Sequence, residues 1–434
     1  MSEQLRAFRG NILHCLRDPG EGGARDAAEH FEDGLLLVAD GRVVALGPAA
    51  ELLPGLPASA ELIDHRGRLL VPGFIDTHIH YPQLDVIASY GEQLLEWLEQ
   101  YTFPQEMRFA DEQHAAAVAE LFLDELLRNG TTTALVFATV HPQSVDAFFE
   151  AARARRLRML CGKVLMDRNC PAALRDTAAS GAADSRALIE RWHGVDRLLY
   201  AITPRFAPTS TAAQLAAAGR LAAEYPGVYL QTHLAENRAE CDWVAELFPD
   251  SRSYLDVYYR HGLLRERAVF AHCLHLDDAD RRCMAGQGAA MAFCPTSNLF
   301  LGSGLFDLAA ARDAGLRVGL GSDVGGGDSF SPLRTASEAY KVCQLRGRKL
   351  PALRALYLAT LGGAEALYLD DRLGNFAIGK EADFVVLDPA ATPLLARRTG
   401  LTADIEELLF ALLMLGDDRA VLETRVLGEL AHRR

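Results

Sequence analysis

VPGFIDTHIH, residues 71–80, is an apolar run that ends in two histidines. Residues two apart on a strand face the same side, so His78 and His80 can point at one ion. Further apolar runs follow at 131–139, 158–167, 197–206, 227–236, 267–275, 288–298 and 316–323. Stretches with helical spacing separate them, such as 115–128 and 214–225. Eight alternating β/α units predict an α/β protein with a (β/α)8 TIM barrel.

The two ends of the chain predict separate β-structure. Residues 34–47 are two apolar runs joined by Asp40-Gly41, a strong hairpin signal. Residues 379–388 predict a turn and a strand, and alternating sequence continues from Ala420. Neither end is long enough to form a core alone. We therefore expect one small β-sandwich domain from residues 1–67 and 376–434, bracketing a barrel domain of residues 68–375.

One connection in the barrel is unusually long. Residues 82–108 exceed what a plain βα loop needs, and we expect this segment to fold over the barrel mouth.

Composition excludes several classes of partner. A net charge of −14 without clustered Lys or Arg argues against nucleic acid and anionic membranes. No apolar run approaches the roughly 18 residues that a membrane helix requires. The eight cysteines are scattered without a C-x-x-C pair, and the first residues lack the layout of a secretory signal. These features favour a reduced, cytoplasmic setting.

Metal-competent residues occur at the ends of several predicted strands. His233 and Glu236 end the fifth run, His272 ends the sixth, and Asp323 ends the eighth. Catalytic groups of TIM barrels gather at these carboxyl ends. Imidazole and carboxylate suit zinc, which lowers the pKa of a bound water to about 7 and so supplies hydroxide. The pattern predicts a zinc-dependent hydrolase.

Several motifs carry a resemblance to a known family. PGFIDTHIH, TTTALVF, THLAEN, FAHC, CPTSN, GLGSD and GKEADFVVLD, in this order, resemble landmarks of the amidohydrolase superfamily. Within it, HYPQ (80–83), GEQLLEWLEQYTFPQE (91–106), TPRFAPT (203–209) and NLFLGSG (298–304) are similar to guanine deaminases.

This resemblance implies a site and a reaction. His78, His80, His233 and Asp323 would bind one zinc ion per subunit, with iron as an alternative. His272 would either bind the metal or hydrogen-bond its water. A zinc-bound hydroxide would attack C2 of guanine while Glu236 protonates N3, and loss of ammonia would leave xanthine. The resemblance also implies a homodimer acting in purine catabolism or salvage.

Position along the chain suggests the substrate contacts. The Gln83 amide offers a donor and an acceptor for the N2/N3 edge of guanine, and Arg205 offers donors for O6 and N7. Phe206 and Trp97 can stack on the purine plane. Each has a plainer interpretation: Arg205 as a structural partner of a carboxylate, Trp97 as helix core, and Gln83 as a helix cap.

Other assignments remain open on the sequence alone. Two-metal relatives use a carboxylated lysine at the end of the fourth strand, but residues 195–210 contain no lysine, which favours a single metal. The same metal site would serve a deaminase or dechlorinase of a triazine, pterin or cytosine. A non-enzymatic scaffold is disfavoured because every expected ligand position is filled.

Overall fold

The computed structural model describes residues 5–91 and 93–434 and contains two compact units. The first extends to Ile75 and includes Asp124–Thr132 and Ser331–Arg434. The second comprises Asp76–Leu123 and Thr133–Phe330. The domain boundaries expected at 67/68 and 375/376 stay predictions. In the described part of the chain, every helix is too short or too polar to cross a membrane.

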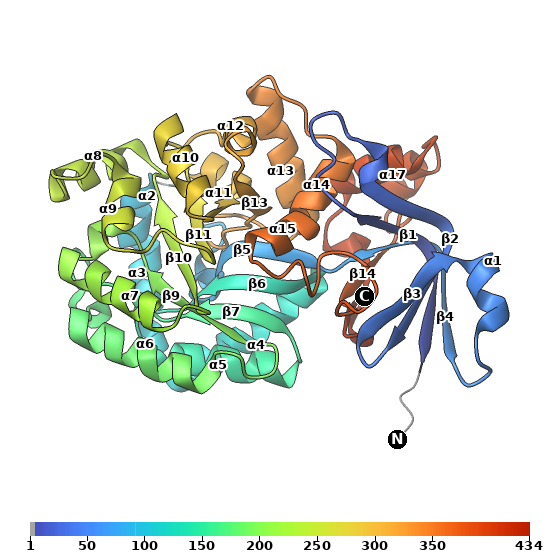
Figure 1. The fold of residues 1–434 in the computed structure, drawn as a ribbon, viewed down its shortest axis with the longest axis horizontal. Helices are drawn as coiled ribbons and strands as arrows, with labels where there is room; N and C mark the ends of the chain where they lie inside the picture. The colour runs from blue at the N-terminus through green and yellow to red at the C-terminus, as the bar shows by residue number, and fades with distance from the viewer. Residues whose placement is uncertain (1–4, 92) are drawn as a thin grey trace. The chain divides into compact units, whose positions relative to one another are not determined.

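Parallel strands, with helices between them, form the predicted barrel (Figure 1). Each strand lies within one of the apolar runs recognised in the sequence. In spatial order they are β5 (Phe74–His80), β6 (Thr131–Phe137), β7 (Arg158–Gly162), β9 (Leu199–Pro204), β10 (Tyr229–Leu234), β11 (Ala268–His272), β12 (Ala290–Phe293) and β13 (Arg317–Leu320), with the short β8 (Val164–Leu165) paired to β9. The eight-unit prediction is confirmed.

Backbone hydrogen bonds join the first barrel strand to the segment that follows the last one. The Asp323 N–H donates to the His78 carbonyl, and the His80 N–H donates to the Val324 carbonyl, both at 2.9 Å. These bonds place the two histidines of β5 directly beside Asp323.

A buried carboxylate reinforces the same junction. Asp76 Oδ1 accepts the N–H groups of His78 and Ser322 at 3.1 Å each, and the Ser322 hydroxyl donates to Oδ2. Burial raises the pKa of Asp76 to about 6, against the lowering effect of these hydrogen bonds. Asp76 therefore supports the two segments beneath the site.

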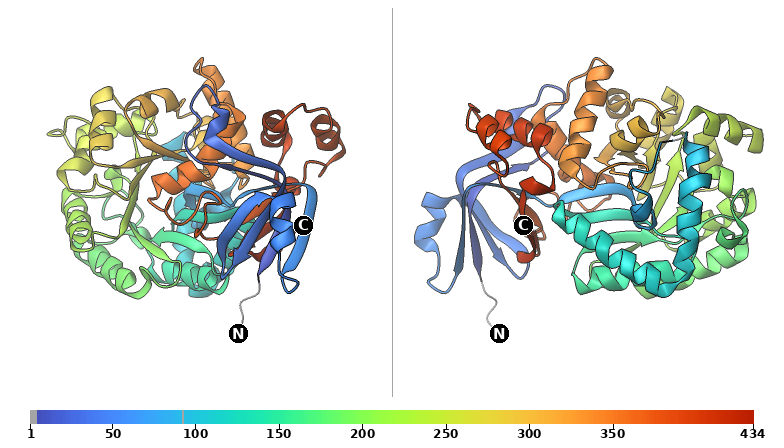
Figure 2. Two further views of the ribbon diagram at one scale, coloured as in Figure 1. Left: turned by 45° about the vertical axis from the view of Figure 1, so that its right-hand side comes forward. Right: turned by 180° about the vertical axis from the view of Figure 1, so that it is seen from behind.

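The ends of the chain meet in one seven-stranded sheet, drawn in blue and red in Figure 2. Its order is β16 (Glu429–Arg433), β15 (Val421–Val426), β14 (Phe384–Leu387), β4 (Glu61–Pro72), β1 (Arg6–Cys15), β2 (Ala28–Ala39) and β3 (Arg42–Pro48). β14 and β4 pair antiparallel, which joins the two halves. Asp40 and Gly41 both have positive φ, 54° and 72°, as the predicted two-residue hairpin requires.

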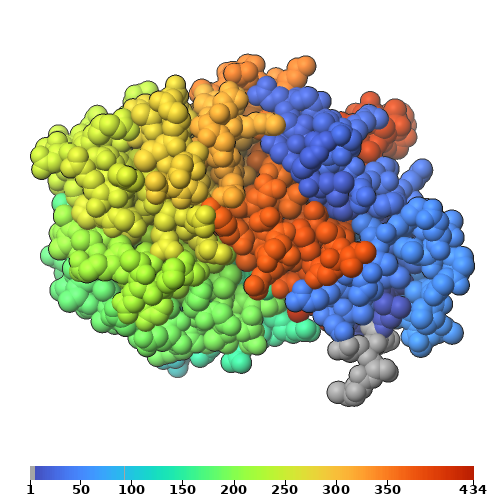
Figure 3. Space-filling view, in the orientation of Figure 1, coloured from blue at the N-terminus to red at the C-terminus, as the bar shows by residue number. Residues whose placement is uncertain are grey.

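Helices cover the barrel strands, and in the space-filling view their side chains close over the strands on the face shown (Figure 3). The helices after the barrel mouth are α4 (Glu112–Arg128), α5 (Pro142–Ala154), α6 (Ala178–Trp192), α7 (Ala212–Glu224), α8 (Arg238–Leu247), α9 (Tyr254–Arg260), α10 (Asp278–Gly286), α11 (Pro295–Phe300) and α12 (Leu308–Asp313). The first unit holds α1 (Ala49–Leu52), α13 (Pro332–Leu345), α14 (Ala352–Ala359), α15 (Leu361–Ala366), α16 (Pro393–Thr399) and α17 (Ile405–Leu415).

The long segment after β5 covers the strand ends, as predicted. It contains α2 (Leu94–Trp97), a π-turn (Leu98–Thr102) and α3 (Phe103–Met107). Trp97 and Phe103 pack in one buried cluster with Phe137, Met166 and Phe206, which lie at or just beyond the ends of β6, β8 and β9.

Gly162 lies where two barrel strands, β7 and β9, approach each other closely. A Cβ there would lie 1.6 Å from the Ala201 carbonyl oxygen. We expect Gly162→Ala to destabilise the fold by about 3 kcal/mol, because β7 and β9 would have to separate. Thermal unfolding should show this loss, while Gly286→Ala, in a helix with open space around it, should leave stability unchanged or raise it. Equal melting temperatures for both variants would contradict the prediction.

Candidate active site

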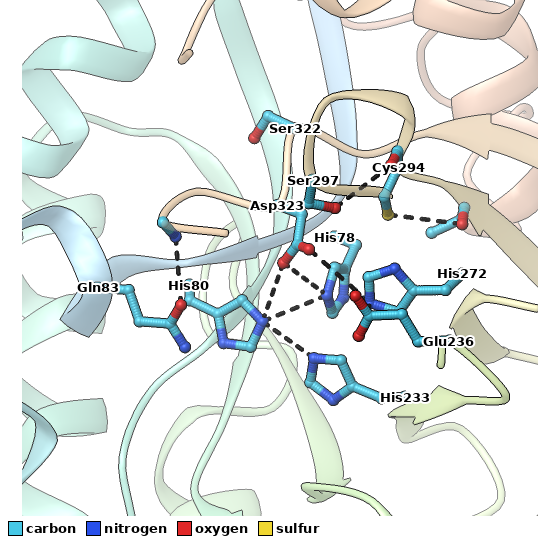
Figure 4. A network of polar contacts seen from close by, with 12 residues as sticks. His78, His80, Gln83, His233, Glu236, His272, Cys294, Ser297, Ser322 and Asp323 are labelled. Carbon is cyan, nitrogen blue, oxygen red and sulfur yellow. Dashed lines mark hydrogen bonds and ion pairs between the residues drawn. The ribbon is translucent and has the colours of Figure 1, made fainter. Parts of the chain in front are cut away.

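Three imidazoles and a carboxylate converge where β5, β10 and β13 end (Figure 4). His80 Nε2 lies 3.2 Å from both His78 Nε2 and His233 Nε2. Asp323 Oδ1 lies 3.1 Å from His78 Nε2 and 3.3 Å from His80 Nε2. The structure therefore brings these four residues together, and their role as metal ligands stays a prediction.

His272, at the end of β11, completes the group. One potential ligand atom from each of His78, His233, His272 and Asp323 lies within 4.8 Å of the others. His272 Nε2 is 3.8 Å from Asp323 Oδ2. His272 could therefore contribute to the same metal site as His78, His233 and Asp323.

The hydrogen bonds made by the Nδ1 atoms determine which Nε2 atoms carry a free lone pair. His233 Nδ1–H donates to the Arg205 carbonyl at 2.7 Å, and His272 Nδ1–H donates to Asn298 Oδ1 at 2.9 Å. Each Nε2 is then unprotonated and faces the centre. His272 Nε2, although buried, makes no hydrogen bond to any described residue. An acceptor-only cluster of this kind fits a cation, and imidazole with carboxylate fits zinc or iron.

Burial keeps the histidines neutral. It lowers the pKa values of His78 and His233, and lowers that of His80 to about 3. For Asp323, burial acts to raise the pKa, but the adjacent His78 outweighs it and holds the pKa well below its usual range. The cluster therefore presents neutral imidazoles and a carboxylate, the protonation states that bind a metal.

The backbone at these strand ends is strained. Ala235, His272, Cys273 and Asp323 have φ values between 50° and 70°, in the left-handed region that side chains rarely adopt. Such conformations persist where the surrounding structure imposes them, and they are typical of functional sites. Here they turn the chain sharply after β10, β11 and β13.

Glu236 lies beside the cluster and not within it. Its Oε1 accepts the Ser303 hydroxyl at 3.0 Å, and its Oε2 lies 3.4 Å from His272 Nε2. Burial, and then the negative Asp323, raise the pKa of Glu236 to about 8. His275 donates from Nε2 to the Ser303 carbonyl at 3.2 Å and so supports this serine.

A second buried glutamate fixes the backbone of Glu236. Glu240 Oε2 accepts the N–H groups of Glu236 and Asn237, and its Oε1 accepts the Tyr254 hydroxyl at 2.6 Å. Asn237 and Glu240 form a capping box at the start of α8. The N-x-x-E spacing is a known sequence signature of a helix N-terminus and could have pointed to Glu240.

A pocket of about 410 Å³ opens beside the cluster. All five residues expected to contact substrate line it: Gln83, Trp97, Arg205, Phe206 and Glu236. Its lining is formed by His80, Gln83, Leu94, Trp97, Leu98, Arg205, Phe206, His233, Glu236, Glu240, Leu301, Asp323 and Gly326. The pocket is therefore apolar on the side of α2, with a few polar groups opposite, which suits a small aromatic ring.

Arg205 has a carboxylate partner that the sequence did not reveal. Its Nη1 donates to both oxygens of Glu106 at 2.8 Å. Glu106 belongs to α3 and not to a barrel strand. Gln83 Nε2 donates to the same carboxylate at 3.4 Å, and Gln83 Oε1 accepts the Gly325 N–H at 3.2 Å. Gln83 does not cap a helix.

Two alternative metal ligands point elsewhere. The Cys294 thiol donates to the Ala292 carbonyl and makes no contact with the ring nitrogens of the cluster in Figure 4. Lys163 is fully buried, and its ammonium contacts Asp176 and the Val164 carbonyl. Lys163 is thus engaged in an ion pair with Asp176, and a single metal stays a prediction.

Comparison with known proteins places this fold and site in a family. The amidohydrolase family model matches residues 69–429. The chain therefore belongs to the amidohydrolase family, whose members are metal-dependent hydrolases.

Several similar proteins are guanine deaminases. Guanine deaminase of Escherichia coli (strain K12) is 51% identical over 433 residues, covering 99% of this chain and 98% of that protein. A solved E. coli guanine deaminase superposes with a TM-score of 0.97 at 52% identity, covering 99% and 100% of the two chains. A structure of guanine deaminase from C. acetobutylicum with bound guanine has a TM-score of 0.88 at 28% identity, covering 98% and 100%.

Asn298 holds the His272 ring, so its removal should weaken metal binding. We expect Asn298→Ala to lower zinc affinity about 10- to 100-fold, because the imidazole loses its fixed orientation. Competition with a chromogenic chelator measures the affinity. The exposed amide variant Gln113→Ala should match the wild type, and an Asn298→Ala protein of unchanged affinity would contradict the assignment.

Proposed function

We propose that this protein is a guanine deaminase that hydrolyses guanine to xanthine and ammonia. The observation that carries the proposal is the pocket in which Gln83 and Arg205 lie beside a three-histidine, one-aspartate cluster. Full-length similarity to curated guanine deaminases supports it.

We assign His78, His80, His233 and Asp323 as zinc ligands, with His272 as a fifth ligand or a partner of the bound water. When bound, zinc supplies a water of lowered pKa as the nucleophile. The residues themselves align the reaction: the backbone turn at Asp323 and the His233–Arg205 hydrogen bond fix the directions of two ligands.

Glu236 is the group that moves protons in this proposal. It lies within 3.4 Å of His272 on one side and lines the substrate pocket on the other. A carboxyl of raised pKa can take a proton from the nucleophilic water and deliver it to N3, then to the departing amine. Asp323, whose pKa is held low, stays ionised.

Substrate recognition rests on residues from two sides of the pocket. We propose that Gln83 reads the N2/N3 edge of guanine and that Arg205 donates to O6 and N7. Trp97 and Phe206 provide apolar walls and are 2% and 4% exposed. A triazine or pterin deaminase would require a different set of polar groups over the same metal.

We further propose a cytoplasmic homodimer that acts in purine catabolism or salvage. The absence of a membrane-spanning helix among the described residues is compatible with this setting. The dimer and the pathway rest on family resemblance.

Removal of the metal should abolish the activity reversibly. We expect the chelator-treated protein to release no ammonia from guanine and to regain activity with about one equivalent of zinc per chain. Metal analysis coupled to an ammonia assay measures both. A metal-free protein that keeps full activity would overturn the proposal.

Glu236→Gln separates proton transfer from metal binding. We expect zinc content to stay at the wild-type level and kcat to fall roughly 10²- to 10⁴-fold, because the amide cannot shuttle a proton. Steady-state kinetics with metal analysis provide the test. A variant that retains wild-type kcat would remove Glu236 from this role.

A further inference from the structure

We propose that Glu106 determines specificity by holding Arg205 and Gln83 in place and cancelling the charge of Arg205, so that the pocket accepts a neutral purine and discriminates against an anionic one. Glu106 acts through these two neighbours and is a positioning residue. This inference rests on the proposed function for the identity of the substrate.

The contacts make Glu106 a common anchor for both recognition residues. It receives two hydrogen bonds from Arg205 and one from Gln83. Its exposed fraction is 1%, and that of Arg205 is 2%. Glu106 does not line the pocket, whereas its two partners do. The carboxylate thus supports the polar wall from behind.

Arg205 is also held from a second direction. Its guanidinium lies over the Phe103 ring at 5.3 Å, and Phe103 and Glu106 share α3. Both hydrogen bonds to Glu106 leave from one nitrogen, Nη1. A guanidinium carries five N–H donors, so the rest of the fork remains for a ligand. α3 therefore fixes the orientation of the Arg205 guanidinium and leaves its remaining N–H donors available to a ligand.

The charge balance gives this arrangement its selectivity. A buried arginine without a counter-ion attracts anions strongly, because little solvent screens it. With Glu106 paired to it, Arg205 offers directed donors but no net charge. The O6/N7 edge of neutral guanine needs donors alone, whereas a purine anion would gain from an unpaired cation.

Glu106→Gln removes the negative charge of the side chain and keeps its shape. The amide keeps the side-chain volume and an acceptor oxygen for Arg205, but leaves the guanidinium uncompensated. The matched control is Glu99→Gln, which removes the same charge from an exposed position in the π-turn of the same segment. Glu106→Asp keeps the charge while shortening the side chain.

The experiment compares two purines that differ in charge. Calorimetry on the zinc-loaded proteins at neutral pH measures binding of urate, an anion, and hypoxanthine, which is neutral. We expect Glu106→Gln to bind urate about ten-fold more tightly relative to hypoxanthine than the wild type does, since charged hydrogen bonds replace neutral ones. KM for guanine should rise by more than kcat falls. Glu99→Gln should leave both readouts unchanged.

Each outcome decides the proposal. An unchanged urate-to-hypoxanthine ratio in Glu106→Gln overturns it, because a merely structural role would weaken both ligands together. If Glu106→Gln does not fold, Glu106→Ala takes its place with the same two outcomes: a ratio shifted towards urate supports the proposal, and an unchanged ratio overturns it. Glu106→Asp, which keeps the charge, should leave the ratio unchanged, and a shift towards urate in this variant would also overturn the proposal. Failure of the wild type to deaminate guanine would instead refute the proposed function, while the binding ratio would still test Glu106.

Discussion

The site depends on closure of the barrel between its first and last strands. Two backbone hydrogen bonds join β5 to the segment after β13, and they bring His78 and His80 beside Asp323. Asp76 of β5 accepts the N–H groups of His78 and Ser322 and so stabilises the register of the two segments. A shift of one residue would turn the histidines of β5 to the outer face, because side chains alternate along a strand. The positions of His78, His80 and Asp323 therefore depend on correct closure of the barrel.

Arg205 couples the metal cluster to the substrate pocket. Its carbonyl oxygen accepts from His233 Nδ1, while its side chain lines the pocket and pairs with Glu106. A displacement of this residue would move the His233 imidazole and one wall of the pocket together. Glu236 has a comparable position, since Ser303 and His272 contact opposite oxygens of its carboxylate. The cluster and the pocket therefore depend on some of the same residues.

Sequence alone predicted the barrel, its eight strand runs and the cluster of ligands, because periodicity and strand-end position are local signals. The pairing of β14 with β4 could be inferred only as a joining of the two chain ends. Glu106 was not predicted because its partner Arg205 is distant in the chain, and nothing local distinguishes Glu106 from Glu96 or Glu99 in the same segment. Asn298 in α11 and Ser303 just after that helix were not predicted for the same reason, because they contact His272 and Glu236, which follow other strands.

The sheet built from both chain ends has a consequence for how the protein is made. β4 pairs with β1 on one side and with β14 on the other, and β14 leaves the ribosome only after every barrel strand. Until then β4 presents an unpaired edge, a surface that invites association with other strands. Completion of this sheet is therefore a late event of synthesis, and the emergence of residues 384–387 ends the interval in which that edge is open.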